Sequence, residues 1–174
     1  SEVNINVLTH LASQRTLELV IKQGFAFDEA TQLAENTVLS ELGLKQNLAA
    51  PFHRLQLNEN SIDNRELLGA SAFILSTASE LPSVGLEELL DRMAMELESG
   101  QLGTSTRLEY EKGLQESDIE SFKNNLSSYL INIEVTPNFP ETAGLPMPIT
   151  TRPVAVLKED NLIGPIGQLI VMTA

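Results

Sequence analysis

The distribution of proline constrains the fold of this chain more than any other feature. Proline fixes its own φ angle and has no amide hydrogen, so it interrupts helices and central strands. Six of the eight prolines lie near the C-terminus, at Pro137, Pro140, Pro146, Pro148, Pro153 and Pro165. Only Pro51 and Pro82 interrupt residues 1–131. We therefore expect a helical domain over residues 1–131 and a proline-rich, non-helical tail over residues 132–174.

Apolar residues at helical spacing predict a first helix over residues 5–23. They are Val7, Leu8, Leu11, Leu19 and Val20. Asn4 or Asn6 can accept hydrogen bonds from the first-turn amides, and Gly24 is suited to the left-handed position that ends a helix.

A second helix is expected to begin at Asp28 and to end at Gly43. Its expected apolar side consists of Leu33, Thr37, Val38 and Leu42. The connection of residues 25–27 is short, so the first two helices should be antiparallel neighbours.

A third helix, from about Asp63 to the interruption at Pro82, is apolar almost all round and contains a run of small residues, 69–72. Such a helix is expected at the centre of a domain, with close neighbours. A groove beside Gly69 and Ala72 is a candidate contact surface for a partner.

Two or three further helices complete the predicted domain. The fourth covers residues 84–98, with apolar residues at Leu86, Leu89, Leu90, Met93 and Leu97. Capping-box patterns start at Thr106 and at Ser117, and an apolar stripe follows the second. The fold class is therefore mainly α, a compact bundle of about five or six helices. With no Trp, six Phe and two Tyr, its core should be aliphatic.

The tail contains two short apolar runs, residues 154–157 and 169–172, which predict strands separated by turn-forming residues. Two strands alone are marginally stable, so they must pack on the helices, pair at an edge or belong to a following domain. An exposed edge at Leu169, Ile170 and Val171 is a second candidate for partner contact.

The charge is strongly unbalanced, with 24 acidic and 11 basic residues and a formal net charge of −13. Phosphate backbones and anionic membrane surfaces repel such a chain, so neither nucleic acid nor a lipid surface is an expected partner. The absence of cysteine excludes disulfides, thiolate catalysis and cysteine-ligated metals.

Few residues suggest reactive chemistry, and no catalytic, cofactor-binding or metal-ligating residue is predicted. His10 and His53 lack further ligands at metal-binding spacing, and Ser13 lacks the motif of an activated nucleophile. The polar loop around Asn58 and Asp63 offers oxygens to a cation, but it lacks the spacing of a calcium-binding loop.

Carboxylates on the fourth helix leave one enzymatic alternative open. Glu87 and Asp91 lie one turn apart and would support a hydrolase if they faced a shared cleft. The simpler interpretation is a solvated helix start, in which Glu88 and Arg92 form an i,i+4 ion pair.

Several segments resemble, in their order and spacing, the helical domain of a family of cell-envelope lipoproteins from Gram-negative bacteria. They are Val3-Asn4-Ile5-Asn6-Val7-Leu8-Thr9-His10-Leu11-Ala12 with Arg15, Gly24-Phe25-Ala26-Phe27-Asp28-Glu29-Ala30, residues 67–75, residues 86–90, residues 119–126 and Pro137-Asn138-Phe139. In that family the helical domain usually follows a β-domain resembling a carboxypeptidase regulatory domain. The resemblance covers about residues 3–140 and implies export and attachment through a separate lipidated N-terminus. It carries over no catalytic residue and no ligand.

These observations predict a non-enzymatic scaffold or interaction domain of an exported bacterial protein, periplasmic or attached to the cell surface. The alternative is a binding module for a peptide, a glycan or a partner protein. The opening residues carry no signal sequence, so the chain is expected to be a piece of a longer protein whose anchor lies elsewhere. No cofactor is expected, and the sequence does not predict an oligomeric state.

Overall fold

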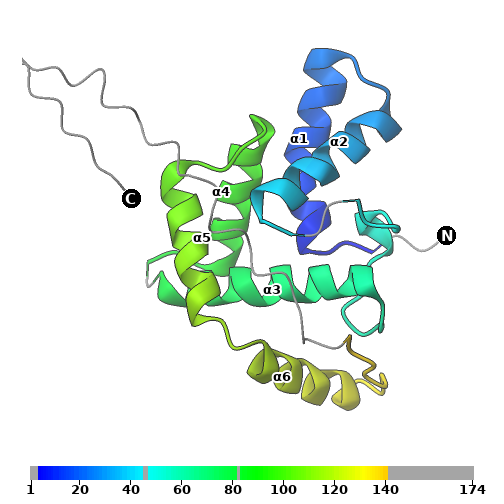
Figure 1. Ribbon diagram of the computed structural model, residues 1–174, viewed down its shortest axis with the longest axis vertical. Helices are drawn as coiled ribbons and strands as arrows, with labels where there is room; N and C mark the ends of the chain where they lie inside the picture. Colours follow the sequence, from blue (N-terminus) through cyan, green and yellow to red (C-terminus); the bar gives the residue numbers. More distant parts are fainter. Residues whose placement is uncertain (1–3, 45–46, 82, 141–174) are drawn as a thin grey trace, which may run out of the picture.

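The structure, a computed structural model, describes residues 4–44, 47–81 and 83–140 (Figure 1). The two predicted strands and the candidate edge at Leu169, Ile170 and Val171 lie outside these residues. Within the described ranges the chain is mainly helical and contains no strand, which confirms the expected class.

In the part of the chain that the structure describes, six α-helices and one short 3₁₀ helix follow one another. They are α1 (Val7–Gln23), α2 (Phe27–Glu41), η1 (Phe52–Arg54), α3 (Ile62–Glu80), α4 (Leu86–Glu98), α5 (Thr104–Glu116) and α6 (Ile119–Asn132).

The ends of α1 follow from local sequence, as expected. The Asn6 side chain accepts hydrogen bonds from the amides of Leu8 and Thr9, and the Thr9 hydroxyl accepts one from the Asn6 amide. These reciprocal bonds form a capping box. Gly24 ends the helix with φ 75°, a left-handed conformation that glycine adopts without a Cβ clash.

The buried face of α2 differs from the expected one. It consists of Ala30, Ala34, Val38 and Leu39, whereas Leu33 is 40% exposed and Thr37 is only half-buried. The two alanines allow α2 to lie close against α1, and large apolar residues are a poor guide to a face that requires small ones.

The predicted capping boxes at Thr106 and Ser117 are wrong. The cap of α5 is Gly103, three residues before Thr106, because Glu96 on α4 accepts hydrogen bonds from the Gly103 amide (2.9 Å) and the Thr106 hydroxyl (2.9 Å). The helix α6 is capped by Asp118, whose carboxylate accepts from the Ser121 amide, and Ser117 instead ends α5.

The helices form two groups, α1 with α2 and α4, and α3 with α5 and α6, and α3 contacts both α4 and α1 where the groups meet. The helix α1 packs on both α2 and α4, and α3 packs on α5 and, less extensively, on α4 and α1 (Figure 1). Eleven of the 19 residues of α3 are buried, which agrees with the expected central position. The core is aliphatic, as expected, with Phe52, Phe73 and Tyr110 added. The helix α6 lies against α3 and has no fully buried residue.

The closest approach of α3 and α5 yields a stability prediction. A Cβ atom at Gly113 would lie 2.0 Å from the Thr77 hydroxyl oxygen and 2.6 Å from the Thr77 Cα. Backbone atoms cannot move aside cheaply, so Gly113→Ala should destabilise the fold by about 3 kcal/mol, measured by urea unfolding. Gly85→Ala is the matched control, since a Cβ there meets nothing within 4 Å. Equal stability of the two variants would contradict this account of the α3–α5 contact.

Candidate functional site

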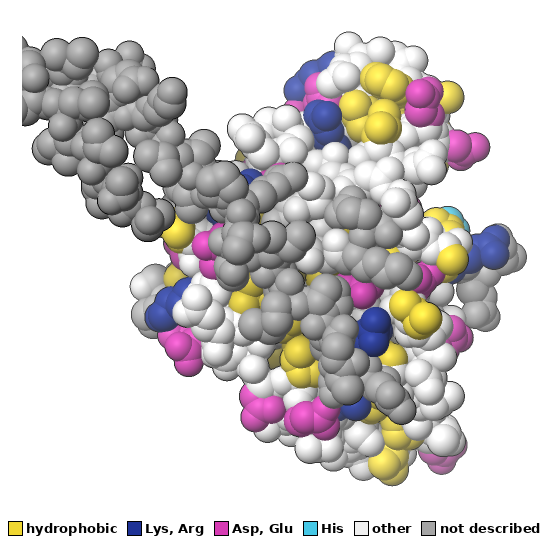
Figure 2. Space-filling view, viewed as in Figure 1, with side chains coloured by type: hydrophobic (Ala, Val, Ile, Leu, Met, Phe, Trp, Pro, Cys, Tyr) yellow, Lys and Arg dark blue, Asp and Glu magenta, His cyan; other side chains and the backbone are white. Residues whose placement is uncertain are grey.

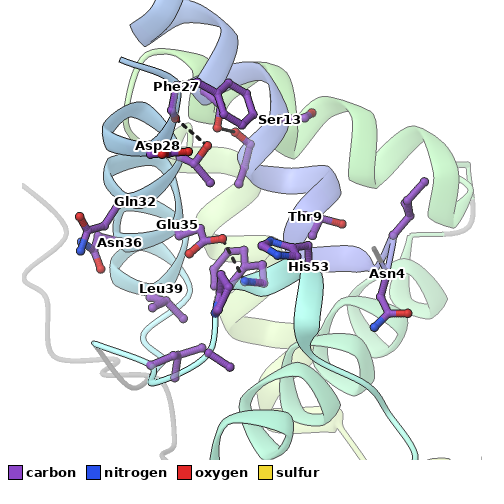
Figure 3. Close-up of a pocket in the computed structure, with 18 of the residues that line it drawn as sticks. Asn4, Thr9, Ser13, Phe27, Asp28, Gln32, Glu35, Asn36, Leu39 and His53 are labelled. Atoms are coloured by element: carbon purple, nitrogen blue, oxygen red, sulfur yellow. Dashed lines mark hydrogen bonds between the residues drawn. The ribbon is translucent and has the colours of Figure 1, made fainter. Parts of the chain in front are cut away.

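A groove of about 990 Å³ lies between α1, α2 and the loop that joins α2 to η1 (Figure 3). We refer to residues 47–53 as the wall loop. The groove is large enough for a segment of polypeptide or an oligosaccharide, since typical ligand pockets measure roughly 300–1,000 Å³.

Each helical wall is a single helix face. The α1 wall consists of Thr9, Ala12, Ser13, Thr16 and Leu17. The α2 wall consists of Phe27, Asp28, Thr31, Gln32, Glu35, Asn36 and Leu39. Residues three or four positions apart share one side of a helix, so each set forms a continuous stripe along its helix. Apart from Leu17, Phe27 and Leu39, the side chains of these two stripes are polar or small.

Two carboxylates hold the wall loop in place. Asp63, in the first turn of α3, accepts hydrogen bonds from the amides of Ala49 (2.7 Å) and Ala50 (2.9 Å) through Oδ2. Glu35 on α2 accepts one from the Phe52 amide (2.9 Å) through Oε1. Backbone amides outside regular secondary structure need such acceptors, and bonds to charged groups are the stronger ones.

The N-terminal segment reinforces the same loop. The Asn6 side-chain amide donates to the Phe52 carbonyl oxygen (2.7 Å), and the Asn4 amide donates to the His53 carbonyl oxygen (2.9 Å). The residue that caps α1 thus also fixes the wall loop, so the groove and the start of α1 form together.

The pKa of the Glu35 carboxyl is raised above its ordinary value of 4.5, chiefly because partial burial disfavours the charged form. The Phe52 amide and the nearby His53 act in the opposite direction but do not cancel this effect. In Figure 3 the Glu35 side chain extends from α2 toward the wall loop. Its partly desolvated carboxylate therefore lies between α2 and the wall loop and lines the groove.

The groove is acidic and partly apolar. Its lining includes two carboxylates, Asp28 and Glu35, and one histidine, His53, and contains no lysine or arginine among the described residues. Three large apolar residues of the lining are unusually exposed: Ile5 is 90% exposed, Phe27 66% and Leu17 50%. Apolar side chains also gather on the surface at the α1–α2 end of the molecule (Figure 2). Exposed apolar residues around a cavity are typical of binding surfaces.

The structure separates the two histidines and gives Ser13 a structural partner. His53 lies in the groove, whereas His10 Nε2 lies 3.1 Å from Asp91 on α4. The Ser13 hydroxyl donates to the carbonyl oxygen of His10 (2.7 Å). Ser13 therefore lines the groove with its hydroxyl bonded to the backbone of its own helix.

The carboxylates considered for hydrolysis lie elsewhere. Glu87 and Asp91 are exposed on α4 and do not line the groove. Arg92 forms its ion pair with Glu109 on α5 rather than the expected pair with Glu88. The pair therefore connects two helices instead of stabilising one.

The predicted contact residues in α3 are not in this groove. Gly69 and Ala72 are both buried. In the polar loop, Asp63 and Asn64 are buried and accept hydrogen bonds from backbone amides, those of Asp63 belonging to the wall loop. No cluster of three or more potential metal-ligating side chains occurs in the described part of the chain.

Sequence reasoning missed the groove because its walls come from three separate segments. The one available signal was the pair of polar stripes on the faces of the first two helices, which are adjacent in sequence and antiparallel. These stripes do not by themselves indicate a groove, because the position of the wall loop depends on contacts with Asp63 and Glu35 that are distant in sequence.

Comparison with known proteins finds no matching family model, no matching curated protein and no matching solved structure. Among the described helices, none has the length and hydropathy needed to span a bilayer.

Removing the Asp63 carboxylate should loosen the wall loop. Asp63→Ala deletes the acceptor of two backbone amides and should cost about 2 kcal/mol of unfolding free energy. Asp63→Asn keeps one oxygen in place and should cost less than Asp63→Ala. Urea denaturation of both variants tests this order. An Asp63→Asn variant at least as unstable as Asp63→Ala would show that the hydrogen bonds are not the main contribution of Asp63 to stability.

Glu35 should make stability depend on pH. A carboxyl whose pKa is raised by folding stabilises the folded state fully below pH 4.5, and this contribution is lost as the pH rises through the folded-state pKa. Glu35→Gln stays uncharged, and its amide oxygen can still accept from the Phe52 amide. Its stability relative to the wild type should therefore increase between pH 4 and pH 7.

Thermal or urea unfolding across that pH range measures the difference. Glu29→Gln, which removes an exposed carboxylate of the same helix outside the groove, controls for net charge. A Glu35→Gln difference that stayed constant with pH, or that fell toward neutral pH, would contradict the desolvation of Glu35.

Proposed function

We propose that this chain is a non-enzymatic interaction domain that binds a segment of a partner in the groove between α1, α2 and the wall loop. The observation that carries the proposal is a groove of about 990 Å³ whose loop is fixed in place by Asp63 and Glu35. A preformed groove lowers the entropic cost of binding, because the protein does not have to order the loop when the ligand arrives.

The polar groups of the groove support binding rather than catalysis. The Ser13 hydroxyl and one oxygen of Glu35 are engaged with backbone groups of the protein itself. Amide and hydroxyl side chains such as Thr31, Gln32 and Asn36 line the remaining wall. Such groups orient a ligand, while the exposed apolar residues supply contact area.

The setting that we propose is an exported bacterial protein, periplasmic or attached to the cell surface through a separate lipidated N-terminus. Its support is the resemblance of residues 3–140 to the helical domain of Gram-negative cell-envelope lipoproteins. A binding groove without a reactive constellation is compatible with the scaffold or interaction role expected from the sequence.

Selection from a random library of twelve-residue peptides displayed on phage tests the binding role. Ala49 is exposed in the wall loop, and Ala49→Trp would fill the groove while leaving its backbone amide free to donate to Asp63. Enriched peptides should bind the wild-type chain and lose at least about tenfold in affinity on Ala49→Trp, by fluorescence polarisation.

Gln115→Trp is the matched control, since Gln115 is exposed on α5 and lies outside the groove. It should leave peptide affinity unchanged, and circular dichroism should show that both variants remain folded. A selection that yields no peptide, or peptides that bind the Ala49→Trp variant as well as the wild type, would refute a peptide-binding groove.

A further inference from the structure

We infer that the occupant of the groove is an extended, partly apolar peptide segment that carries two basic side chains three positions apart, one for Asp28 and one for Glu35. The inference rests on the proposed function and specifies its ligand. It is carried by the charge of the lining, the spacing of the two carboxylates and the exposed apolar residues beside them.

The charge of the groove lining indicates the sign of the charge on the ligand. The described lining contains two carboxylates and no lysine or arginine, and its one basic group is His53. The chain as a whole carries a net charge of −13. An anionic segment would be repelled at long range and would meet no lysine or arginine in the described lining, whereas a cationic segment is attracted and finds a partner.

The position of Glu35 strengthens the preference of the groove for a cationic segment. Its carboxylate is partly desolvated, as the raised pKa reflects, and one oxygen already accepts from the Phe52 amide. A partly buried carboxylate gains more from an added cation than an exposed one, because solvent screens the interaction less. Lysine or arginine of a partner would supply that cation.

The distance between Asp28 and Glu35 determines how far apart the basic residues of the ligand must lie. Asp28 and Glu35 are seven residues apart on α2, so they lie on nearly the same face and about 10.5 Å apart along the helix axis. An extended or polyproline II segment advances about 9–10 Å in three residues. In a polyproline II segment, residues three apart also project on the same side, so basic residues at positions i and i+3 match the two carboxylates.

The exposed apolar residues account for the rest of the segment. Phe27 and Leu17 lie on the facing walls at the Asp28 end of the groove, and Ile5 precedes α1. Apolar side chains between and beside the basic positions would cover these residues and remove them from water. This requirement distinguishes the proposed segment from a uniformly basic one.

The sequences of the peptides selected on the wild-type chain test the inference. Peptides that lose affinity on Ala49→Trp should be enriched in Lys or Arg three positions apart, with apolar neighbours, and depleted in Asp and Glu. Groove-dependent peptides without basic enrichment would overturn the inference and leave the proposed function standing. A selection without groove-dependent peptides would overturn both.

Charge-neutralising variants of the groove provide a second test. Their affinities are measured for one enriched basic peptide and for the same peptide with Gln in place of both basic residues. Glu35→Gln and Asp28→Asn should each weaken the basic peptide by about fivefold, as expected for a single partly screened ion pair. Neither variant should alter binding of the Gln peptide. Glu29→Gln is the matched control and should change neither affinity.

Ionic strength separates charge pairing from simple hydrophobic binding. The affinity of the basic peptide should fall as the salt concentration is raised from 50 to about 500 mM, and that of the Gln peptide should change much less. Equal affinities of the two peptides, or full retention of binding by a Glu35→Gln, Asp28→Asn double variant, would overturn the pairing.

Discussion

Hydrogen bonds from backbone amides to buried or half-buried carboxylates hold the irregular parts of this fold in place. Asp63 accepts from Ala49 and Ala50, and Glu35 accepts from Phe52. In the connection between α4 and α5, Glu41 and Glu96 accept from the amides of Leu102 and Gly103. Apart from the bond between Glu96 and Gly103, these bonds join residues at least 13 positions apart, so the connections are positioned by tertiary contacts rather than by turn sequences of their own.

The acidity of the chain therefore has two physical roles. Some carboxylates, such as Glu29 and Glu87, are exposed and keep the surface solvated. Others accept hydrogen bonds from backbone amides inside the structure. Glu35 does this for the wall loop and also lines the groove. The same excess of negative charge that argues against nucleic acid as a partner favours a cationic one. Composition and site geometry thus indicate the same ligand chemistry.

The sequence predicts the helices well where their signals are local. Asn6 and Gly24 delimit α1, and the aliphatic spacing of residues 86–97 places α4. Prediction fails where a distant residue decides the outcome: Glu96 rather than Thr106 fixes the start of α5, and Glu109 rather than Glu88 pairs with Arg92. The groove belongs to this second class, since Asp63 appeared as part of a polar turn and His53 as an isolated histidine. Neither residue type nor spacing indicates that Asp63 holds the loop to which His53 belongs.

Hydrogen exchange of the wall-loop amides tests the central claim most directly. If Asp63 and Glu35 hold the loop before any ligand binds, the amides of Ala49, Ala50 and Phe52 in the free protein should exchange far more slowly than an unstructured peptide of the same sequence. Residue-resolved exchange by NMR at neutral pH gives these rates. Exchange at the rate of the unstructured peptide for all three amides would show that the loop is not fixed by these carboxylates and that the groove is not preformed.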